Sequence, residues 1–262
     1  MRHRRQRCWD FLPTHGTAIA SQLLLIRPRA LTTPEMTQRA PDSEEIAVVL
    51  IGSFNPAIFH PEWFLRQQIL LQNEAEEAKV RTVSPEATQV TFLDLKLDVF
   101  PDRFMLYTAD SSRAEKLQDI VLNVLNRLPH TPITACGINN VIDFDLNDEA
   151  YWHKIGHTLA PKALIWNDVL EMPGMANLVV KGVRKGDFPG DINVTVSPSR
   201  HSRMRHGISI SSNFHYPVPQ SEDGIPDSYL LTPYLNHEWK PALDQARKVA
   251  YQIFEKIQKD PS

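Results

Sequence analysis

Hydrophobic and polar residues alternate along several short stretches of the chain, and a period of two is the pattern of a strand with one buried face. In the clearest stretch, Leu93, Leu95 and Leu97 alternate with charged residues, and a similar alternation returns around Ile192 and around Ile208. Half-buried strands of this kind are typical of antiparallel sheets. We therefore predict strands at 46–51, 79–84, 93–99, 104–108, 133–144, 177–183, 192–196 and 208–214.

Other stretches repeat their apolar residues every three or four positions, which predicts helices with one buried face. The first is expected to open at Pro61, because the N–H that proline lacks is not used in the first helical turn. The second follows Ser112, whose hydroxyl would form a capping box with Glu115. The third can be capped by Asn147 or Asp148. We expect these helices at 61–71, 112–128, 148–159 and 241–257, the last beginning near Pro241.

The predicted elements follow the same order twice. Residues 46–128 and 133–258 each give the order β-α-β-β-β-α, which suggests an internal duplication although the two halves share little residue identity. We predict an α+β fold in which 46–258 form one domain of mainly antiparallel sheet, with helices packed on one face. The uncovered face, or the seam between the halves, would leave room for a ligand or a partner.

Four tryptophans lie on or beside the predicted helices at apolar positions. Large aromatic side chains at helical spacing are usually part of the core, so we expect most of them to be buried. They are Trp63, Trp152, Trp166 and Trp239.

The first 45 residues differ in composition from the rest, and we expect them to lie outside the domain. Residues 1–35 hold six Arg and two acidic residues, a formal charge of +4, whereas the other 227 of the 262 residues hold 22 bases and 29 acids, or −7. We interpret 1–45 as a disordered basic tail or as a spurious extension, with Met36 as the true first residue. An organelle transit peptide is a third interpretation.

Length and composition exclude several classes of protein. No stretch approaches the roughly 20 consecutive apolar residues that a membrane-spanning helix needs. The two cysteines, Cys8 and Cys136, cannot form a disulfide framework, which favours a cytoplasmic location. Neither a Walker A loop nor a dinucleotide-binding glycine motif occurs, so no nucleotide cofactor is predicted.

Two histidines on one helical face are the first candidate for chemistry. His153 and His157 are four residues apart, and Glu149 precedes them by another turn, which is an acceptable ligand set for a first-row metal. The zinc-protease motif requires glutamate directly after the first histidine, and here Lys154 occupies that place. We favour the competing interpretation, an exposed helix face on which Glu149 contacts His153.

A basic segment between the last two predicted strands is the second candidate. Arg200, Arg203 and Arg205 lie close together there, and guanidinium groups suit phosphate because their donors are forked and always charged. No aromatic residues are interleaved with them for base stacking, and the chain beyond the tail is acidic. Phosphate contact is therefore a weak expectation, and nucleic-acid binding is disfavoured.

No catalytic residue is predicted. The chain has no G-x-S-x-G nucleophile motif, and Cys136 lies in an apolar strand, where a thiol behaves as a small hydrophobic group. The leading hypothesis is a non-catalytic binding or interaction module without a cofactor, partnered by an unknown protein or by a second copy of itself. The alternative is a metal-dependent hydrolase that uses Glu149, His153 and His157, and the third is anion contact through the basic segment.

A few loops are more specific in sequence than tight turns require, among them 159–163 and 171–175. The motifs in and around such loops resemble those of a family of uncharacterised bacterial proteins. The resemblance covers about residues 46–257 and implies a protein that begins near Met36. The family has no assigned activity, so the resemblance implies no catalytic residue. The motifs are Ile51-Gly-Ser-Phe-Asn-Pro, Phe59-His-Pro-Glu-Trp63, Gly137-Ile-Asn139, His157-x-Leu-Ala-Pro-Lys162 and Pro173-Gly-Met175.

Overall fold

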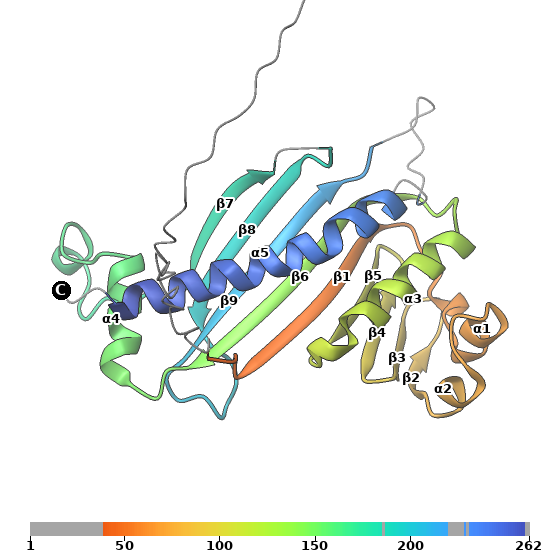
Figure 1. Cartoon of the computed structure of the whole chain (residues 1–262), viewed down its shortest axis with the longest axis horizontal. Helices are drawn as coiled ribbons and strands as arrows, with labels where there is room; N and C mark the ends of the chain where they lie inside the picture. The colour runs from red at the N-terminus through yellow and green to blue at the C-terminus, as the bar shows by residue number, and fades with distance from the viewer. Residues whose placement is uncertain (1–38, 185–186, 220–227, 229–230, 260–262) are drawn as a thin grey trace, which may run out of the picture. The chain divides into compact units, whose positions relative to one another are not determined.

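A computed structural model of the chain describes residues 39–184, 187–219, 228 and 231–259 (Figure 1). Residues 1–38 of the tail predicted at 1–45 lie outside the described residues. Residues 43–45 belong to the first strand of the sheet, so the predicted boundary between tail and domain at 45 is wrong. Residues Ala40–Ser262 form one compact unit. The described part of this unit consists of one antiparallel sheet with helices, which confirms the predicted α+β class.

Within the described residues, nine strands form the sheet in the order β2-β3-β4-β5-β1-β6-β9-β8-β7, and every neighbouring pair is antiparallel. The two central strands pair along their whole length, from Ser43 opposite Asp143 to Gly52 opposite Ile133. The strands are β1 (Ser43–Gly52), β2 (Lys79–Val83), β3 (Thr88–Phe92), β4 (Leu95–Phe100), β5 (Arg103–Thr108), β6 (Ile133–Asp145), β7 (Leu178–Arg184), β8 (Gly190–Pro198) and β9 (Gly207–Pro217).

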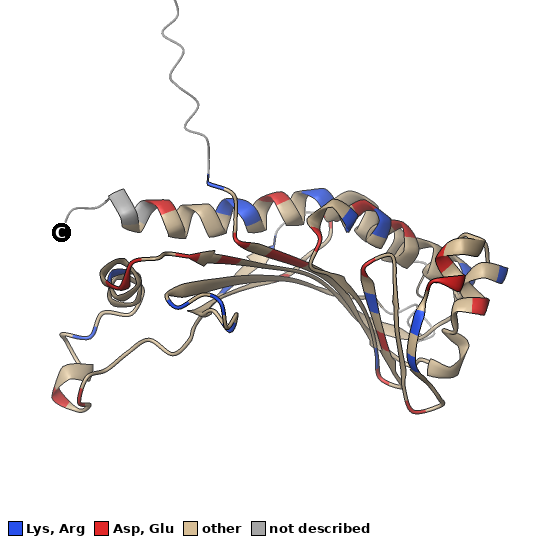
Figure 2. Cartoon of the chain, turned by 90° about the horizontal axis from the view of Figure 1, so that it is seen from below, with Lys and Arg blue, Asp and Glu red and all other residues tan. Residues whose placement is uncertain are grey.

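The two long helices cover one face of the sheet (Figure 2). Helix α3 packs on β5 and β1, and helix α5 packs on β6 and β9. No helix among the described residues combines the length and the apolar character that crossing a membrane requires. The helices are α1 (Pro61–Arg66), α2 (Gln72–Glu76), α3 (Ala114–Arg127), α4 (Glu149–Leu159) and α5 (Leu231–Lys259).

The core lies between the sheet and these helices. Alternate residues of β1, namely Ile46, Val48 and Leu50, are fully buried, as the period-two pattern predicts. A second, smaller cluster lies towards the far end of β6, where Phe144 stacks on Phe254 of α5 with ring centroids 4.6 Å apart. Helices α3 and α5 therefore each bury one apolar stripe against the same face of the sheet.

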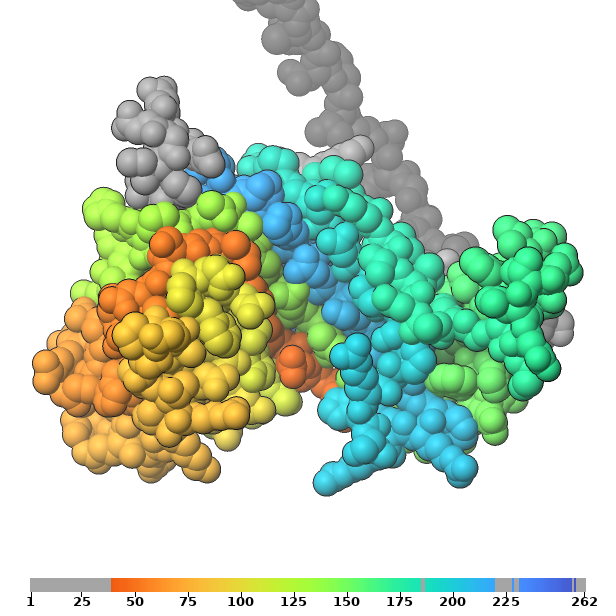
Figure 3. Space-filling view, turned by 180° about the vertical axis from the view of Figure 1, so that it is seen from behind, coloured from red at the N-terminus to blue at the C-terminus, as the bar shows by residue number. Residues whose placement is uncertain are grey.

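The opposite face of the sheet is concave, and neither of the long helices lies on it (Figures 2 and 3). On three strands of the second half this face carries a polar row, because the register sets Asn139, Asn213 and Asn193 side by side across β6, β9 and β8. The side-chain amide of Asn213 donates a hydrogen bond to Asn139. The alternation of apolar and polar residues thus gives the sheet a solvent-facing side as well as a buried one.

The sequence pattern missed strand β3 (Thr88–Phe92), and the prediction that the next strand starts at Leu93 is wrong. Leu93 and Asp94 instead form the turn between β3 and β4, with positive φ angles of 52° and 62°. The first half of the described fold therefore has five strands and the second has four. Both halves run outwards from the central pair β1–β6, and the internal duplication stays a prediction.

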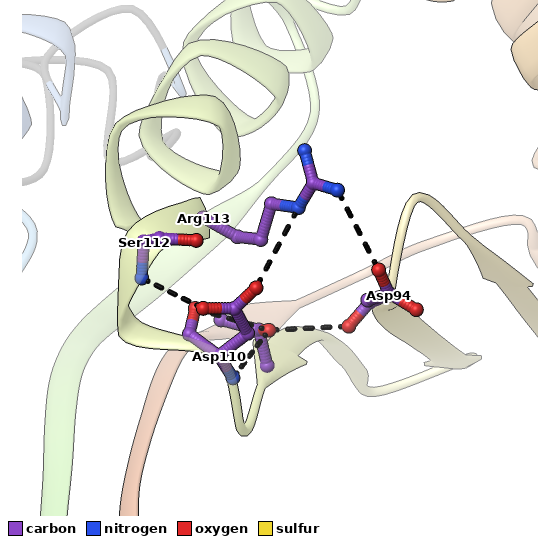
Figure 4. A network of polar contacts seen from close by, with 5 residues as sticks. Asp94, Asp110, Ser112 and Arg113 are labelled. Carbon is purple, nitrogen blue, oxygen red and sulfur yellow. Dashed lines mark hydrogen bonds and ion pairs between the residues drawn. The ribbon is translucent and has the colours of Figure 1, made fainter.

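The predicted capping box of Ser112 and Glu115 is wrong, because a short 3-10 turn (Ser111–Arg113) precedes helix α3. Asp110 caps this turn by accepting a hydrogen bond from the N–H of Ser112 (Figure 4). Hydrogen bonds from Ser112 lower the pKa of the Asp110 carboxyl below its usual value. Arg113 then bridges Asp110 and Asp94 at 3.8 and 3.6 Å. This polar network stabilises the turn from which α3 begins.

The last helix begins at Leu231 and not near Pro241, which lies inside α5. Proline is rare in a helix interior because it removes a backbone hydrogen bond and crowds the preceding turn. Packing explains why the helix continues through it: Tyr234, Leu235 and Trp239 are all buried against the sheet side of the molecule before the proline is reached. Burial of three large side chains outweighs one lost hydrogen bond.

Candidate functional site

Helix α4 is fixed to its neighbours by specific hydrogen bonds. Of the two predicted capping residues it is Asp148 that caps, accepting from two N–H groups of the first turn at 2.9 and 3.1 Å. The indole of Trp152 donates to the carbonyl of Gly207 in β9 at 3.1 Å, and the hydroxyl of Tyr151 donates to the carbonyl of Phe254 in α5. Burial raises the pKa of Tyr151 to about 12. These hydrogen bonds attach α4 to β9 and α5, so that α4 can form one side of a pocket.

The chain that follows α4, residues 160–177, folds back across this helix. Its only regular part is a short 3-10 turn at Trp166–Asp168. At the crossing point a Cβ added to Gly156 would lie 3.8 Å from the Cβ of Met175, which is ordinary contact distance. Met172 turns the chain just before this point with a positive φ of 49°. The returning segment is thus a second wall, facing α4.

A pocket of about 490 Å³ lies between α4, the returning segment and the ends of β8 and β9. Small-molecule sites in proteins are usually of this size, mostly apolar, with a few polar groups. The lining here fits that description, since apolar side chains come from all four elements. They are Trp152, Ile155, Met172, Met175, Pro198 and Ile208.

The ionisable residues of the pocket lining are Lys162, His153 and His157, with no acidic residue among them. Lys162 is only 7% exposed. Its ammonium donates to the carbonyl of Gly156 at 3.0 Å and to that of Ala160, at the C-terminal end of α4. Among the described residues it forms no ion pair. The pocket therefore contains a nearly buried cation without a carboxylate partner.

The returning segment leaves many of its own apolar side chains in water. Met172 is 93% exposed and Leu164 86%, and Trp166 is exposed as well, which makes the prediction of a core position for Trp166 wrong. Trp239 is buried as expected, and Trp63 and Trp152 are partly buried. A contiguous patch of exposed apolar residues often marks a binding site, whereas scattered single residues do not. The exposed set in this segment is Leu164, Ile165, Trp166, Val169, Leu170 and Met172.

The predicted metal ligands lie on one side of α4, but the structure does not gather them into a metal site. Glu149 lies 3.8 Å from His153 and 4.0 Å from His206, whereas the rings of His153 and His157 are 6.3 Å apart. Within the described ranges, no three His, Cys, Asp or Glu side chains are arranged to hold a metal ion. The contact between Glu149 and His153 is the one that an exposed helix face predicts.

The predicted anion-binding residues Arg200, Arg203 and Arg205 lie in the loop between β8 and β9, which the hydrogen bond from Ser199 N–H to the Gly207 carbonyl closes. All three are exposed. In the described part of the chain none of them forms an ion pair or stacks on a ring. The three guanidinium groups are thus exposed to solvent.

A serine, a histidine and an aspartate meet beside this loop, a cluster that the sequence did not indicate because its members lie far apart along the chain. Ser43 Oγ lies 3.2 Å from His201 Nε2 and 3.1 Å from Asp143 Oδ2, and the same Nε2 lies 3.5 Å from that oxygen. A catalytic triad needs the acid and the serine on opposite imidazole nitrogens. Here both face one nitrogen, so the cluster cannot relay a proton from the serine.

Cys136 is fully buried in β6, as expected for a thiol in an apolar strand. Burial raises the pKa of this thiol, which makes it a poor nucleophile.

Sequence reasoning did not identify Lys162 as a functional residue. The motif His157-x-Leu-Ala-Pro-Lys162 contained the signal, because lysine after a proline-terminated helix can reach back to the last carbonyls. No protein-family model matches the chain, and no curated protein matches it in sequence. The pocket beside α4 is therefore judged on its own geometry.

Proposed function

We propose that the protein is a non-catalytic binding module and that the pocket beside α4 holds a small ligand with an apolar body. The observation that carries the proposal is an apolar pocket of about 490 Å³, one wall of which leaves its own apolar side chains exposed. Covering such surface is favourable because it removes apolar area from water. A ligand that fills the pocket would also order the returning segment over it.

The pocket offers no support for a reaction. Ser197 lines it, but within the described residues no imidazole is hydrogen-bonded to its hydroxyl, so the hydroxyl has no activating base. The metal-dependent hydrolase hypothesis has little support, because among the described residues no three His, Cys, Asp or Glu side chains are arranged to hold a metal ion. Binding without turnover is the function that this geometry supports best.

Titration with Nile red, a neutral apolar dye whose emission rises in apolar surroundings, tests the proposal. We expect saturable binding at one site per chain. Ser197→Phe places a large side chain at the pocket lining and should abolish the signal. Thr195→Phe is the matched control, because Thr195 is two residues earlier in β8 on the same face but is not part of the lining. Unchanged dye binding by Ser197→Phe would assign the signal to the exposed segment and refute the pocket.

Pairing with a second copy of the chain through strand β7 is a second candidate, and the unequal edges of the sheet favour it. The outer strand β2 carries exposed Lys79 and Arg81 and an irregular register, features that discourage edge pairing. Strand β7 carries exposed valines instead, and Val183 is 74% exposed. Its single lysine, Lys181, is ion-paired with Asp191 at 2.8 Å.

An antiparallel pair of β7 strands centred on Lys181 would set Val179 opposite Val183 twice, once on each side of the twofold axis. The Asp191 partners would offset the charge of the two facing lysines. We expect a dimer by light scattering over a concentration series. Val183→Lys should yield a monomer, whereas Val80→Lys on the other edge should not. A wild-type monomer at every concentration eliminates this candidate.

We further propose a cytoplasmic location, which rests on a sequence with too few cysteines for a disulfide framework. Membership of the resembling bacterial family stays a prediction as well.

A further inference from the structure

The charges around the pocket point to the chemical class of its ligand. The lining contains the basic side chain of Lys162 and the imidazoles of His153 and His157, and no aspartate or glutamate is part of it. We propose that the ligand is a small organic carboxylate whose apolar body fills the pocket and whose carboxylate binds the ammonium of Lys162. This inference rests on the proposed function and specifies its ligand.

Lys162 retains a donor for such a ligand. An ammonium group has three N–H donors, and two of those of Lys162 go to the carbonyls of Gly156 and Ala160. Those bonds hold the side chain down on the end of α4, so the third donor belongs to a group whose position is already fixed. A fixed cation loses little conformational entropy when an anion binds it.

The charge of Lys162 is only partly offset by its surroundings. The C-terminal end of a helix carries roughly half of a negative elementary charge, which explains why α4 tolerates an ammonium there. The remainder of the positive charge has no carboxylate partner within the described residues. Because the side chain is only 7% exposed, water screens it poorly, and a ligand carboxylate would gain more there than at the surface.

The same helix end disfavours a phosphate. Phosphate sites typically use helix N-termini or forked guanidinium groups, which offer several donors to several oxygens. Here the helix presents carbonyl oxygens, which repel a dianion, and the lining contains one lysine and no arginine. The three exposed arginines of the β8–β9 loop are not part of the lining. A single negative charge on an apolar body is the better match.

Flexible methionines suit an apolar body of variable shape. Met172 and Met175 of the returning segment line the pocket together with Trp152 and Ile155 of α4. Methionine fills irregular space well because its unbranched side chain adapts and its sulfur is polarisable. The pocket would therefore select its ligand by the charged group and tolerate different apolar bodies.

Isothermal titration of the full chain with matched probes tests the inference. The probes are naphthalene-1-acetate and octanoate, each paired with its neutral amide, and 1-naphthyl phosphate as the doubly charged comparison. We expect each carboxylate to bind at least about tenfold more tightly than its amide, which corresponds to about 1.4 kcal/mol. The phosphate should bind more weakly than the carboxylate.

Lys162→Met, which keeps the length and removes the charge, should erase the difference between each carboxylate and its amide. Lys162→Arg should retain a preference for the carboxylate, and exposed Lys248→Met on α5 should change nothing. If Lys162→Met does not fold, the comparison of matched probes on the wild type decides alone. A lysine that acts only as a helix cap would lower stability in Lys162→Met and leave the preference intact, which contradicts the inference.

The outcomes separate this inference from the proposed function. Equal binding of carboxylate and amide overturns the carboxylate preference but leaves a working apolar pocket. Tighter binding of the phosphate overturns the inference in favour of a phosphate site. Failure of all probes, together with the absence of Nile red binding, overturns the proposed function itself.

Discussion

In each half of the fold a connector follows the central strand, and the two connectors differ in how far their apolar side chains are buried. The first connector, residues 53–78, lies between β1 and β2, and the second, residues 146–177, lies between β6 and β7. In the first, Phe59 and Phe64 are buried, and Trp63 packs edge-on against both with centroids 5.6 and 5.0 Å away.

The second connector buries its helix but exposes the segment that returns from it. Ile155 of α4 is 1% exposed, whereas Trp166 is 46% exposed. In Figure 3 this segment protrudes beside β7 and β8. Aromatic residues of the first connector pack on Phe92 and Phe104 of the sheet. The second connector folds back over α4 and leaves a pocket beneath it.

The difference shows where binding is expected. Apolar side chains that can pack on the sheet do so, because burial is worth about 25 cal/mol for each Å² removed from water. A connector that keeps a row of such side chains in water forgoes this stabilisation. We interpret this lost stabilisation as a cost of the ligand-binding site that we propose.

Removing one large aromatic from each connector should give the largest contrast. Phe64→Ala takes away a fully buried ring and is expected to lower the free energy of unfolding by about 3–5 kcal/mol. Trp166→Ala should lower it by only about 1 kcal/mol, because this residue is already 46% exposed in the folded chain. Urea denaturation measures both. Comparable losses would show that the second connector is packed in solution.

The next largest contrast is between a buried residue of the second connector and an exposed residue of the first. Ile155→Ala removes the buried contact of α4 and should lower the free energy of unfolding by about 2–3 kcal/mol, the lower part of the usual range, because the adjacent pocket lets neighbours relax. Leu71→Ala in the first connector should be nearly neutral, since Leu71 is exposed. Thermal unfolding of the pair checks this, and a neutral Ile155→Ala would mean that α4 is not anchored.

The cap of α4 should contribute a smaller amount. Asp148→Ala leaves two N–H groups of the first turn without their acceptor and is expected to cost about 1 kcal/mol. Asp148→Asn, which keeps an acceptor oxygen, should restore most of the loss. If both substitutions cost the same, the charge of Asp148 and not its hydrogen bonds holds the helix end.

The smallest expected effect is a pH dependence that belongs to the second connector alone, because the first contains no tyrosine. Burial raises the pKa of Tyr151 to about 12, above the value of about 10 in an unfolded chain. Its contribution is fully present below pH 10 and is lost as pH rises towards 12, because the unfolded chain releases the proton first. Tyr151→Phe should flatten the decline of stability in this window, and an unchanged decline would assign it to other tyrosines.

Local patterns in the sequence were sufficient for most elements. The alternation around Ile192 and Ile208 identified β8 and β9, and Asp148 was one of two residues expected to cap α4. These features depend on residues that are neighbours in sequence, so a period of two or a capping side chain is visible without knowledge of the fold.

Only the tertiary structure could decide the rest, because long-range packing overrides local preference. Pro241 is a typical helix start, yet the burial of Tyr234 and Trp239 extends α5 through it. Trp166 is a large aromatic residue of the kind usually found in a core, but the folded chain leaves it 46% exposed. The pocket itself depends on 160–177 folding back over α4, and Lys162 acquires its importance only there, where a nearly buried ammonium meets an apolar cavity without a carboxylate partner in the described residues.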